Sequence, residues 1–207
     1  MRKIFLLTIF IVNLFSICSA ETMSEKLAQN FYTENTKKVA IILDIPVEYI
    51  NNEDVKKMVL NKTDNIFKSP KFKILSFDDV QLVKLTYCEE YGIPTFSYKN
   101  NMNNSMLRIY DLINIGNKLQ ADYIFYISLT TSNIIQSEGM FDTSSSAIGR
   151  SEVKLLDVNK KQYVYQKIFI EEGKSTSWFS DISSPRKAYL KSIKKCIEKI
   201  DIDTTKI

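Results

Sequence analysis

The sequence of 207 residues contains no histidine. This absence excludes Ser-His-Asp triads, histidine metal sites and imidazole acid–base catalysis together. The chain also lacks GxGxxG, P-loop and CxxC patterns, so nothing supports a dinucleotide, phosphate-loop or thioredoxin-type site. We therefore assign no catalytic residue, no metal ligand and no cofactor-binding residue, and we expect no cofactor.

Glycine and proline are scarce, with five and four residues in the whole chain. That composition excludes collagen-like and low-complexity proteins. Neither sign of charge is in large excess, since the chain has 28 basic and 24 acidic residues. A nucleic-acid-binding domain would show a concentrated basic stripe, so we expect no nucleic-acid partner. The length fits one domain with a sizeable core.

The one long apolar run, residues 4–20, follows a basic start. A charged start, a short apolar segment and small residues at its end are typical of a secretory signal peptide, here with cleavage after Ala20. A helix that is retained and touches the membrane is an alternative, although a span needs ~20 mostly apolar residues. Lipidation of Cys18 is another, but Ile17 stands where a lipobox has a small residue. The sequence thus predicts an extracytoplasmic protein, periplasmic or secreted.

Two cysteines, Cys88 and Cys196, remain after this cleavage. Each lies on an apolar stripe of a predicted helix, where a free cysteine packs as a small hydrophobic residue. An even pair in an exported chain can also form a disulfide bond. Free, buried thiols are the favoured interpretation and a bridge is the alternative.

Apolar patterns in the first two thirds of the chain predict strands that alternate with helices. The continuous β-branched run at 37–44 is typical of a strand covered on both faces. The predicted elements are a leading helix at 23–32, a strand at 37–44, a helix at 53–67, a strand at 72–77, a helix from Asp78 or Asp79 to Tyr91 that ends at Gly92 and Pro94, a helix from Ser105 to Leu119 and a strand at 121–129.

The pattern then changes to long strands without helices between them. Residues 144–158 and 162–174 flank a short turn and predict an antiparallel hairpin. Ser184 and Pro185 begin a last helix, as N-cap and first helical residue. Its polar face carries Lys187, Lys191, Lys194 and Lys195. Such a face can bind an anionic partner, but a solvated helix face is the commoner cause.

These elements predict an α/β fold with a mixed sheet of about five strands and helices on both faces. Its parallel part is joined at one edge by the long hairpin. The domain organisation follows: a signal peptide at 1–20, a helical lead-in at 21–36, a single α/β domain at 37–200 and a C-terminal tail at 201–207.

Carboxylate pairs occur at Asp78–Asp79, Glu89–Glu90 and Glu171–Glu172. Neighbouring residues in a helix or strand point in different directions, so these pairs are poor candidates for acid–base chemistry. A helix cap or a solvated charge is the favoured interpretation.

Two polar-aromatic stretches are candidate partner-binding segments. One contains Tyr91, Phe96 and Tyr98, and the other contains Trp178 and Phe179 in a Ser-rich connection before the last helix. Exposed aromatic side chains often anchor partners. Packing over the end of the sheet is commoner still, and we expect Trp178 to be mostly buried against the last helix.

Three sequence segments resemble those of a family of bacterial envelope domains: "KKVAIIL", "LINIGNKLQADYIFYISL" and "EVKLLDVNKKQYVYQKIF". They are similar to the α/β domain shared by the TolB amino-terminal domain, the LpoB-type lipoproteins and the curli-secretion protein CsgG. Ala121–Asp122 and Leu155–Val158 fill the places of that family's Ala-Asp pair and "Leu-x-Asp-Val" arm. The resemblance implies a non-enzymatic scaffold, regulator or assembly factor. It therefore implies no catalytic residues in this chain.

The leading hypothesis is therefore an exported, non-enzymatic envelope protein that binds an envelope protein partner through loops at one end of the sheet. Membrane contact is expected only if the signal helix is retained. An exported hydrolase that uses carboxylates and a small-ligand-binding domain are the alternatives.

The export hypothesis predicts the first residue of the mature chain. Mass spectrometry of the secreted or periplasmic protein should find Glu21 at the amino terminus, because signal peptidase cleaves after small residues such as Ala20. A chain that begins at a diacylated Cys18, or that still carries Met1, would contradict the prediction.

Overall fold

A computed structural model describes residues 36–46, 49, 52–68, 70–94, 107–138, 142–178 and 184–207. Contacts divide the chain into Met1–Thr36 and a compact unit, Lys37–Ile207. The predicted signal peptide and nearly all of the helical lead-in lie outside the described residues, and the second unit alone is considered below.

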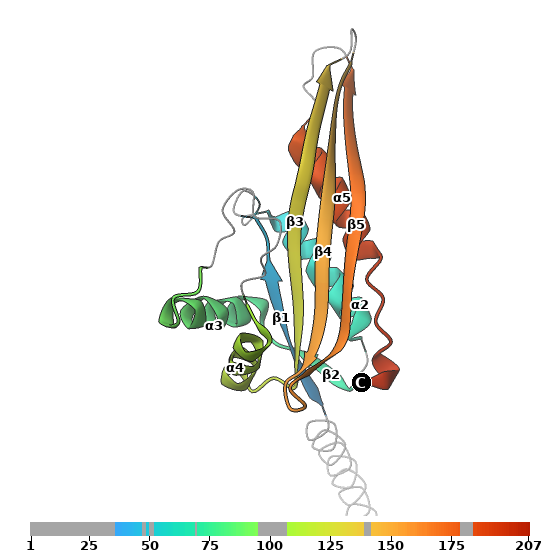
Figure 1. The fold of residues 1–207 in the computed structure, drawn as a ribbon. Helices are drawn as coiled ribbons and strands as arrows, with labels where there is room; N and C mark the ends of the chain where they lie inside the picture. The colour runs from blue at the N-terminus through green and yellow to red at the C-terminus, as the bar shows by residue number, and fades with distance from the viewer. Residues whose placement is uncertain are drawn as a thin grey trace, which may run out of the picture. The chain divides into compact units, whose positions relative to one another are not determined.

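Five strands form one sheet in the order β2-β1-β3-β4-β5 (Figure 1). Strand β1 pairs in parallel with β2 and with β3, whereas β3–β4 and β4–β5 are antiparallel. The strands are β1 (Lys37–Asp44), β2 (Phe72–Ile74), β3 (Tyr123–Glu138), β4 (Asp142–Asp157) and β5 (Gln162–Trp178). The predicted mixed sheet, with a parallel part and a hairpin at one edge, is confirmed.

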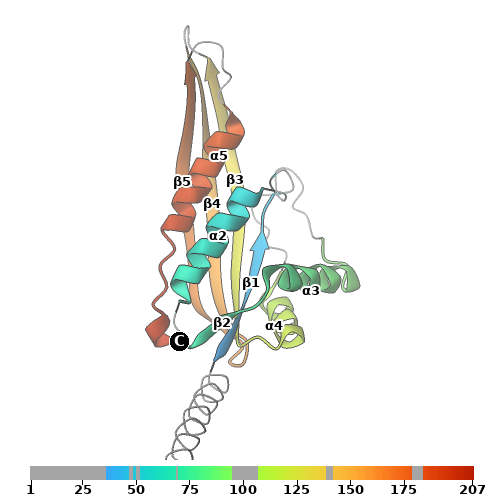
Figure 2. The same cartoon turned by 180° about the vertical axis from the view of Figure 1, so that it is seen from behind.

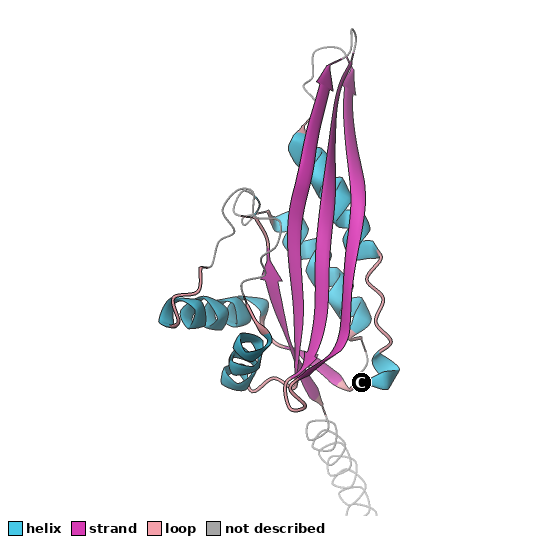
Figure 3. Ribbon diagram, viewed as in Figure 1, coloured by secondary structure: helices cyan, strands magenta, loops and turns pink. Residues whose placement is uncertain are grey.

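The helices cover both faces of the sheet, as predicted, but they do so unevenly. Helices α2 and α5 pack on one face, and α3 and α4 lie on the other (Figures 1 and 2). Their bounds are α2 (Glu53–Ile66), α3 (Phe77–Glu90), α4 (Ile109–Leu119) and α5 (Pro185–Glu198), and a short 3-10 helix, η2 (Thr204–Lys206), follows (Figure 3).

Strand β1 explains why two layers of helices are needed. Val39, Ile41 and Leu43 enter the core beneath α2 and α5, while Ala40 and Ile42 enter the core beneath α3 and α4. Since successive side chains of a strand point to opposite faces, an unbroken apolar run requires cover on both sides. The pattern at 37–44 therefore determines the layered arrangement around β1.

Several predicted helix ends are confirmed. Gly92 has φ +63° directly after α3, a left-handed conformation that glycine adopts without strain. Ser184 is the N-cap of α5 and Pro185 its first residue. The predicted cap of α3 was wrong: Ser76, rather than Asp78 or Asp79, is the N-cap, and its side chain accepts a hydrogen bond from the Asp79 backbone N–H.

Two strands are longer than predicted. Strand β3 continues from the predicted end at 129 to Glu138, and β5 continues from 174 to Trp178. The prediction ended them because Ser and Thr are frequent in both extensions, which is typical of loops. Both stretches instead pair with β4, and strand pairing overrides weak local preference.

Asp122 ties three parts of the fold together. Its carboxylate accepts hydrogen bonds from the Lys38 backbone N–H at 2.8 Å and from the Asn159 side chain at 3.3 Å. Its backbone N–H donates to the Lys38 carbonyl, and its own carbonyl accepts from Val158. The Ala121–Asp122 pair therefore joins the start of β1 to the β4–β5 turn, which is a structural role.

Helix α5 lies unusually close to β4 and β5 because two glycines stand beneath it. A Cβ atom on Gly173 would come within 2.0 Å of the Ala188 carbonyl oxygen and 2.5 Å of the Ser192 nitrogen. A Cβ atom on Gly149 would meet the Ser192 hydroxyl at 2.4 Å. The helix backbone thus occupies the space beside Gly173, and the Ser192 side chain occupies the space beside Gly149.

The cysteines are free and buried, and they lie on opposite faces of the sheet. Cys88 belongs to the core under α3 and α4, and Cys196 to the core under α5. Cys88 and Cys196 do not form the disulfide bond considered as an alternative, because the sheet lies between the two sulfur atoms. Burial raises the pKa of the Cys196 thiol to about 11 and also raises the pKa of Cys88.

The segment 201–207, predicted as a tail, continues the packing of the domain. Ile202 is buried in the core under α5, and Ile207 packs against that core. Its apolar side chains therefore contribute to the same core as α5.

Replacing Gly173 with alanine should destabilise the fold. The new methyl group would press on helix backbone that cannot rotate away, so we expect the free energy of unfolding to fall by about 3 kcal/mol, the upper end for overpacking. Gly149→Ala is the matched control, because it chiefly meets the Ser192 side chain and should cost less. Urea unfolding of both variants decides the matter, and equal losses would contradict the close approach of α5 at Gly173.

Candidate functional site

A group of polar side chains lies at the carboxyl end of β1. Strand β1 pairs with parallel strands on both sides, and the helices that follow it lie on different faces of the sheet. In open α/β sheets, such a reversal of winding leaves a crevice at the carboxyl ends of the strands, where ligands commonly bind. Here that place holds Asp44 of β1, Lys84 of α3 and Tyr126 of β3.

These three side chains satisfy one another. The Lys84 ammonium forms an ion pair with Asp44 and donates to the Leu43 carbonyl oxygen at 3.3 Å. The second Asp44 oxygen accepts from the Tyr126 hydroxyl at 2.6 Å. Only 7% of the Lys84 side chain and 24% of the Asp44 side chain are exposed. Because these groups already have partners, we assign the cluster a structural role.

The sequence contained a sign of this ion pair that the sequence analysis missed. Lys84 lies four residues after Val80 and four before Cys88, on the apolar stripe of α3. A lysine on a buried stripe needs an anionic partner. Asp44 ends the strand at 37–44, but nothing in the sequence brings the two together.

The predicted carboxylate pairs form surface ion pairs. Asp78 lies 2.9 Å from Lys56, and Glu90 lies 2.6 Å from Lys118. Within the described ranges, no group of three acidic or cysteine side chains could hold a metal ion.

The candidate aromatic residues are only partly within the described residues. Tyr91 follows α3, is 58% exposed and stacks on Tyr87 with ring centroids 4.5 Å apart. Phe96, Tyr98 and Phe179 lie outside the described residues. Trp178 is the last residue of β5 and pairs with Asp142, rather than standing in a connection, and its side chain lies outside the described part. Its expected burial stays a prediction.

The larger candidate surface is a sheet face that the sequence analysis did not single out. Strands β3, β4 and β5 have 16, 16 and 17 residues, against 8 in β1. Figure 1 shows these three strands running well past β1, α3 and α4. Helix α5 covers their other face (Figure 2). Among the described elements, no helix covers the opposite face of β3, β4 and β5 where these strands run past β1, the face turned toward the viewer in Figure 1.

The register of the strands places isoleucines diagonally across this uncovered sheet face. Ile170 pairs with Arg150, Ile148 pairs with Glu172, and Ile135 pairs with Ser146. Diagonal neighbours on adjacent strands are within reach of each other. We call Ile135, Ile148, Ile168 and Ile170 the isoleucine diagonal. Three of its members, Ile135, Ile168 and Ile170, are 61%, 45% and 62% exposed.

Polar side chains surround the isoleucine diagonal. Those on the same face include the hydroxyls of Thr130, Ser132, Ser144 and Ser146, and the charged residues Arg150, Glu152 and Lys154. Glu152 and Lys154 form an ion pair at 2.8 Å. The face is therefore apolar in patches, rich in hydroxyls and mixed in charge, as protein–protein interfaces commonly are.

Breaking the buried ion pair tests its structural role. Lys84→Met would leave the partly buried Asp44 carboxylate without its cation, so we expect a loss of about 2–3 kcal/mol in the free energy of unfolding, somewhat below that of a fully buried pair. Lys56→Met, which breaks the ion pair with the exposed Asp78, should change the midpoint little. Recovery of stability in Asp44→Asn/Lys84→Met would support the pair, and an unchanged midpoint in Lys84→Met would contradict it.

Comparison by sequence gives no relatives: no family profile matches the chain, and no curated protein sequence does. Within the described residues, no helix is both long enough and apolar enough to cross a membrane.

Solved structures do match, at low similarity. The LpoB C-terminal domain from Salmonella enterica has 14% identity and a TM-score of 0.34, over 66% of this chain and 82% of that one. A lipoprotein from Neisseria meningitidis has 12% identity and a TM-score of 0.34, over 74% and 92%. The PelC dodecamer from Paraburkholderia phytofirmans has 12% identity and a TM-score of 0.33, over 80% and 84%. LpoB, which the sequence phrases resemble, is thus among the matches, but neither an activity nor a partner follows from this likeness.

Proposed function

We propose that the protein is an exported, non-enzymatic cell-envelope protein that binds a folded protein partner on the uncovered sheet face. The apolar start of the chain supports export, and the absence of histidine and of known catalytic motifs supports a non-enzymatic role. The observation that carries the proposal is the isoleucine diagonal, because large apolar side chains are costly to leave in water.

The chemistry of the face favours a folded protein over other partners. Arg150 and Lys154 are accompanied by Glu152 and Glu172 on the same face, so the face is not the basic stripe that nucleic acid requires. Hydroxyl and charged side chains flank the isoleucines on the same face, so a lipid interior is a poor match. A partner with its own mixed polar and apolar surface fits this pattern.

The other two candidate functions lack a comparable observation. A hydrolase would need converging carboxylates, whereas Asp78 and Glu90 lie in separate surface ion pairs. A small-ligand site at the carboxyl end of β1 would need unpaired polar groups, whereas Lys84 and Asp44 satisfy each other.

A photo-crosslinking amino acid placed at Ile170 tests the proposed surface. Expressed in the producing bacterium, this variant should yield a defined crosslinked species after illumination, because Ile170 is 62% exposed on the proposed interface. Adding Ile168→Asp should reduce the yield about tenfold or more, since a charge would have to be buried without a partner.

Leu82 provides the matched control. It is 63% exposed on α3, away from the isoleucine diagonal, so the same crosslinker there should not capture that species. Capture at Leu82 but not at Ile170, or capture that is insensitive to Ile168→Asp, would overturn the proposed surface. Turnover of a glycan, peptide or ester substrate that one carboxylate substitution abolishes would overturn the non-enzymatic role.

A further inference from the structure

Strand β5 is an edge strand for its whole length of 17 residues. It pairs with β4 on one side, and no described strand pairs with its other side. Edge strands present unpaired backbone N–H and C=O groups, to which another strand can add. The outer edge of β5 is therefore a potential site for an additional strand.

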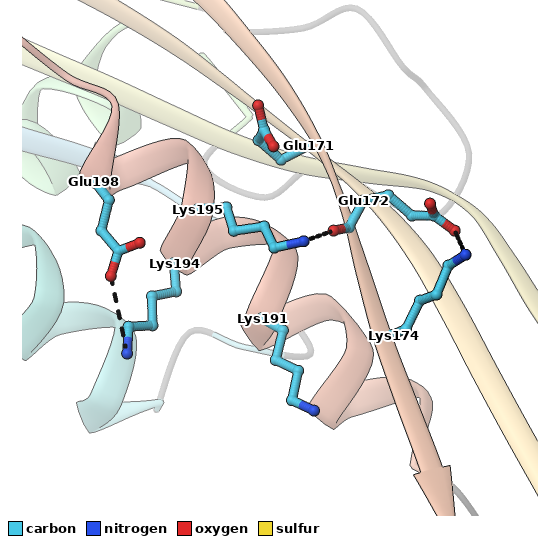
Figure 4. Close-up of a pocket in the computed structure, with 7 residues that line it drawn as sticks. All are labelled: Glu171, Glu172, Lys174, Lys191, Lys194, Lys195 and Glu198. Atoms are coloured by element: carbon cyan, nitrogen blue, oxygen red, sulfur yellow. Dashed lines mark hydrogen bonds and ion pairs between the residues drawn. The ribbon is translucent and has the colours of Figure 1, made fainter.

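The direction of the backbone groups follows from one hydrogen bond. The Lys195 ammonium donates to the Glu172 backbone carbonyl at 2.7 Å (Figure 4). This carbonyl thus points away from β4. Because the direction of the backbone groups alternates along a strand, Ile170 and Lys174 present their N–H and C=O groups to the same outer edge.

A groove of about 520 Å³ lies between this edge and α5. Its lining residues are Glu171, Glu172 and Lys174 from β5, and Lys191, Lys194, Lys195 and Glu198 from α5 (Figure 4). We call it the β5–α5 groove. It combines a strand edge that pairs with no described strand on one side with charged helix side chains on the other.

The three glutamates of the groove already have lysine partners. Glu171 pairs with Lys199, Glu172 lies 3.3 Å from Lys174, and Glu198 lies 3.9 Å from Lys194. Two lysines are left over: within the described part of the chain, Lys191 and Lys195 have no carboxylate partner. The groove therefore carries unbalanced positive charge.

The spacing of these two lysines matches an extended chain. Four residues of helix rise about 6 Å, which separates Lys191 from Lys195 along α5. Alternate residues of a strand, whose side chains share a face, are about 6.8 Å apart. A strand with acidic residues at alternate positions would thus bring successive carboxylates to both lysines.

We propose that the β5–α5 groove binds an acidic, extended segment of a partner protein as a sixth strand. Backbone hydrogen bonds to Ile170, Glu172 and Lys174 hold the segment, and its carboxylates pair with Lys191 and Lys195. A backbone N–H of the segment replaces Lys195 at the Glu172 carbonyl, which releases Lys195 for a carboxylate. This site uses the Ile170 backbone and the α5 lysines, whereas the isoleucine diagonal uses the Ile170 side chain on the sheet face, so failure of peptide binding would leave the proposed function standing.

A second copy of the chain does not fit the same edge. A two-fold axis beside β5 would place the same patch of both copies face to face. The lysines of the two α5 helices would then approach each other, and like charges in contact are destabilising. The charge of the groove therefore favours a different, acidic partner.

The test uses the purified protein and a fluorescent peptide, Thr-Glu-Val-Glu-Val-Glu-Thr, blocked at both ends. Fluorescence anisotropy should show saturable binding, and the same peptide with lysine in place of glutamate should not bind. N-methylation of the valine amides and of the glutamate amides should differ in effect, because only one of these alternating sets faces β5. Binding that both N-methylated peptides retain, or that both lose equally, would overturn strand addition.

Variants of α5 locate the binding site. Lys191→Gln/Lys195→Gln should weaken binding about tenfold or more, whereas Arg186→Gln/Lys187→Gln, which removes the same charge from exposed positions outside the groove, should change it less than about twofold. Equal losses, or no peptide binding at millimolar concentration, would overturn the proposal. So would lysine-dependent binding to phosphatidylglycerol vesicles without peptide binding, which would indicate a membrane surface instead.

Discussion

The close contact between α5 and the two glycines beneath it is the constraint on which the arrangement of β4 and β5 depends. Gly173 and Gly149 leave no room for side chains, since the Ala188 carbonyl and Ser192 occupy that space. One helix at this distance can cover the long strands on a single face. The opposite face then depends on α3 and α4, which follow β2 in the chain and come before the three long strands. The uncovered sheet face is therefore a direct result of where the chain places its helices.

The same helix also shapes the edge of the sheet. With its backbone against Gly173, α5 extends its lysines over the outer side of β5, where Lys195 reaches the Glu172 carbonyl. A lysine at an edge strand hinders indiscriminate pairing with other chains. An acidic strand can exchange that contact for one of its own, so the feature that protects the edge also makes it selective.

The sequence predicted the parts of the fold that local patterns determine. The run at 37–44, the hairpin around its short turn, Gly92 and Ser184–Pro185 each rest on neighbouring residues, and each agrees with the structure. The ends of β3 and β5 depend instead on pairing with β4, which local composition does not reveal. For the same reason the Lys84–Asp44 pair and the isoleucine diagonal could not be predicted: their members are distant in sequence, and only the register of the strands and the docking of α3 bring them together.

The separation of Cys88 and Cys196 by the sheet has a consequence for folding if the chain is exported, as proposed, to an oxidising compartment. In the unfolded chain nothing keeps the two thiols apart, so they can be joined before the sheet forms. Such a bond would hold α3 and α5 on the same side and would have to be reduced before the native layers could assemble. Once folded, both thiols are buried and their raised pKa values leave little reactive thiolate. Oxidation and burial therefore compete. If Cys196 is buried under α5 before it is oxidised, the non-native disulfide cannot form.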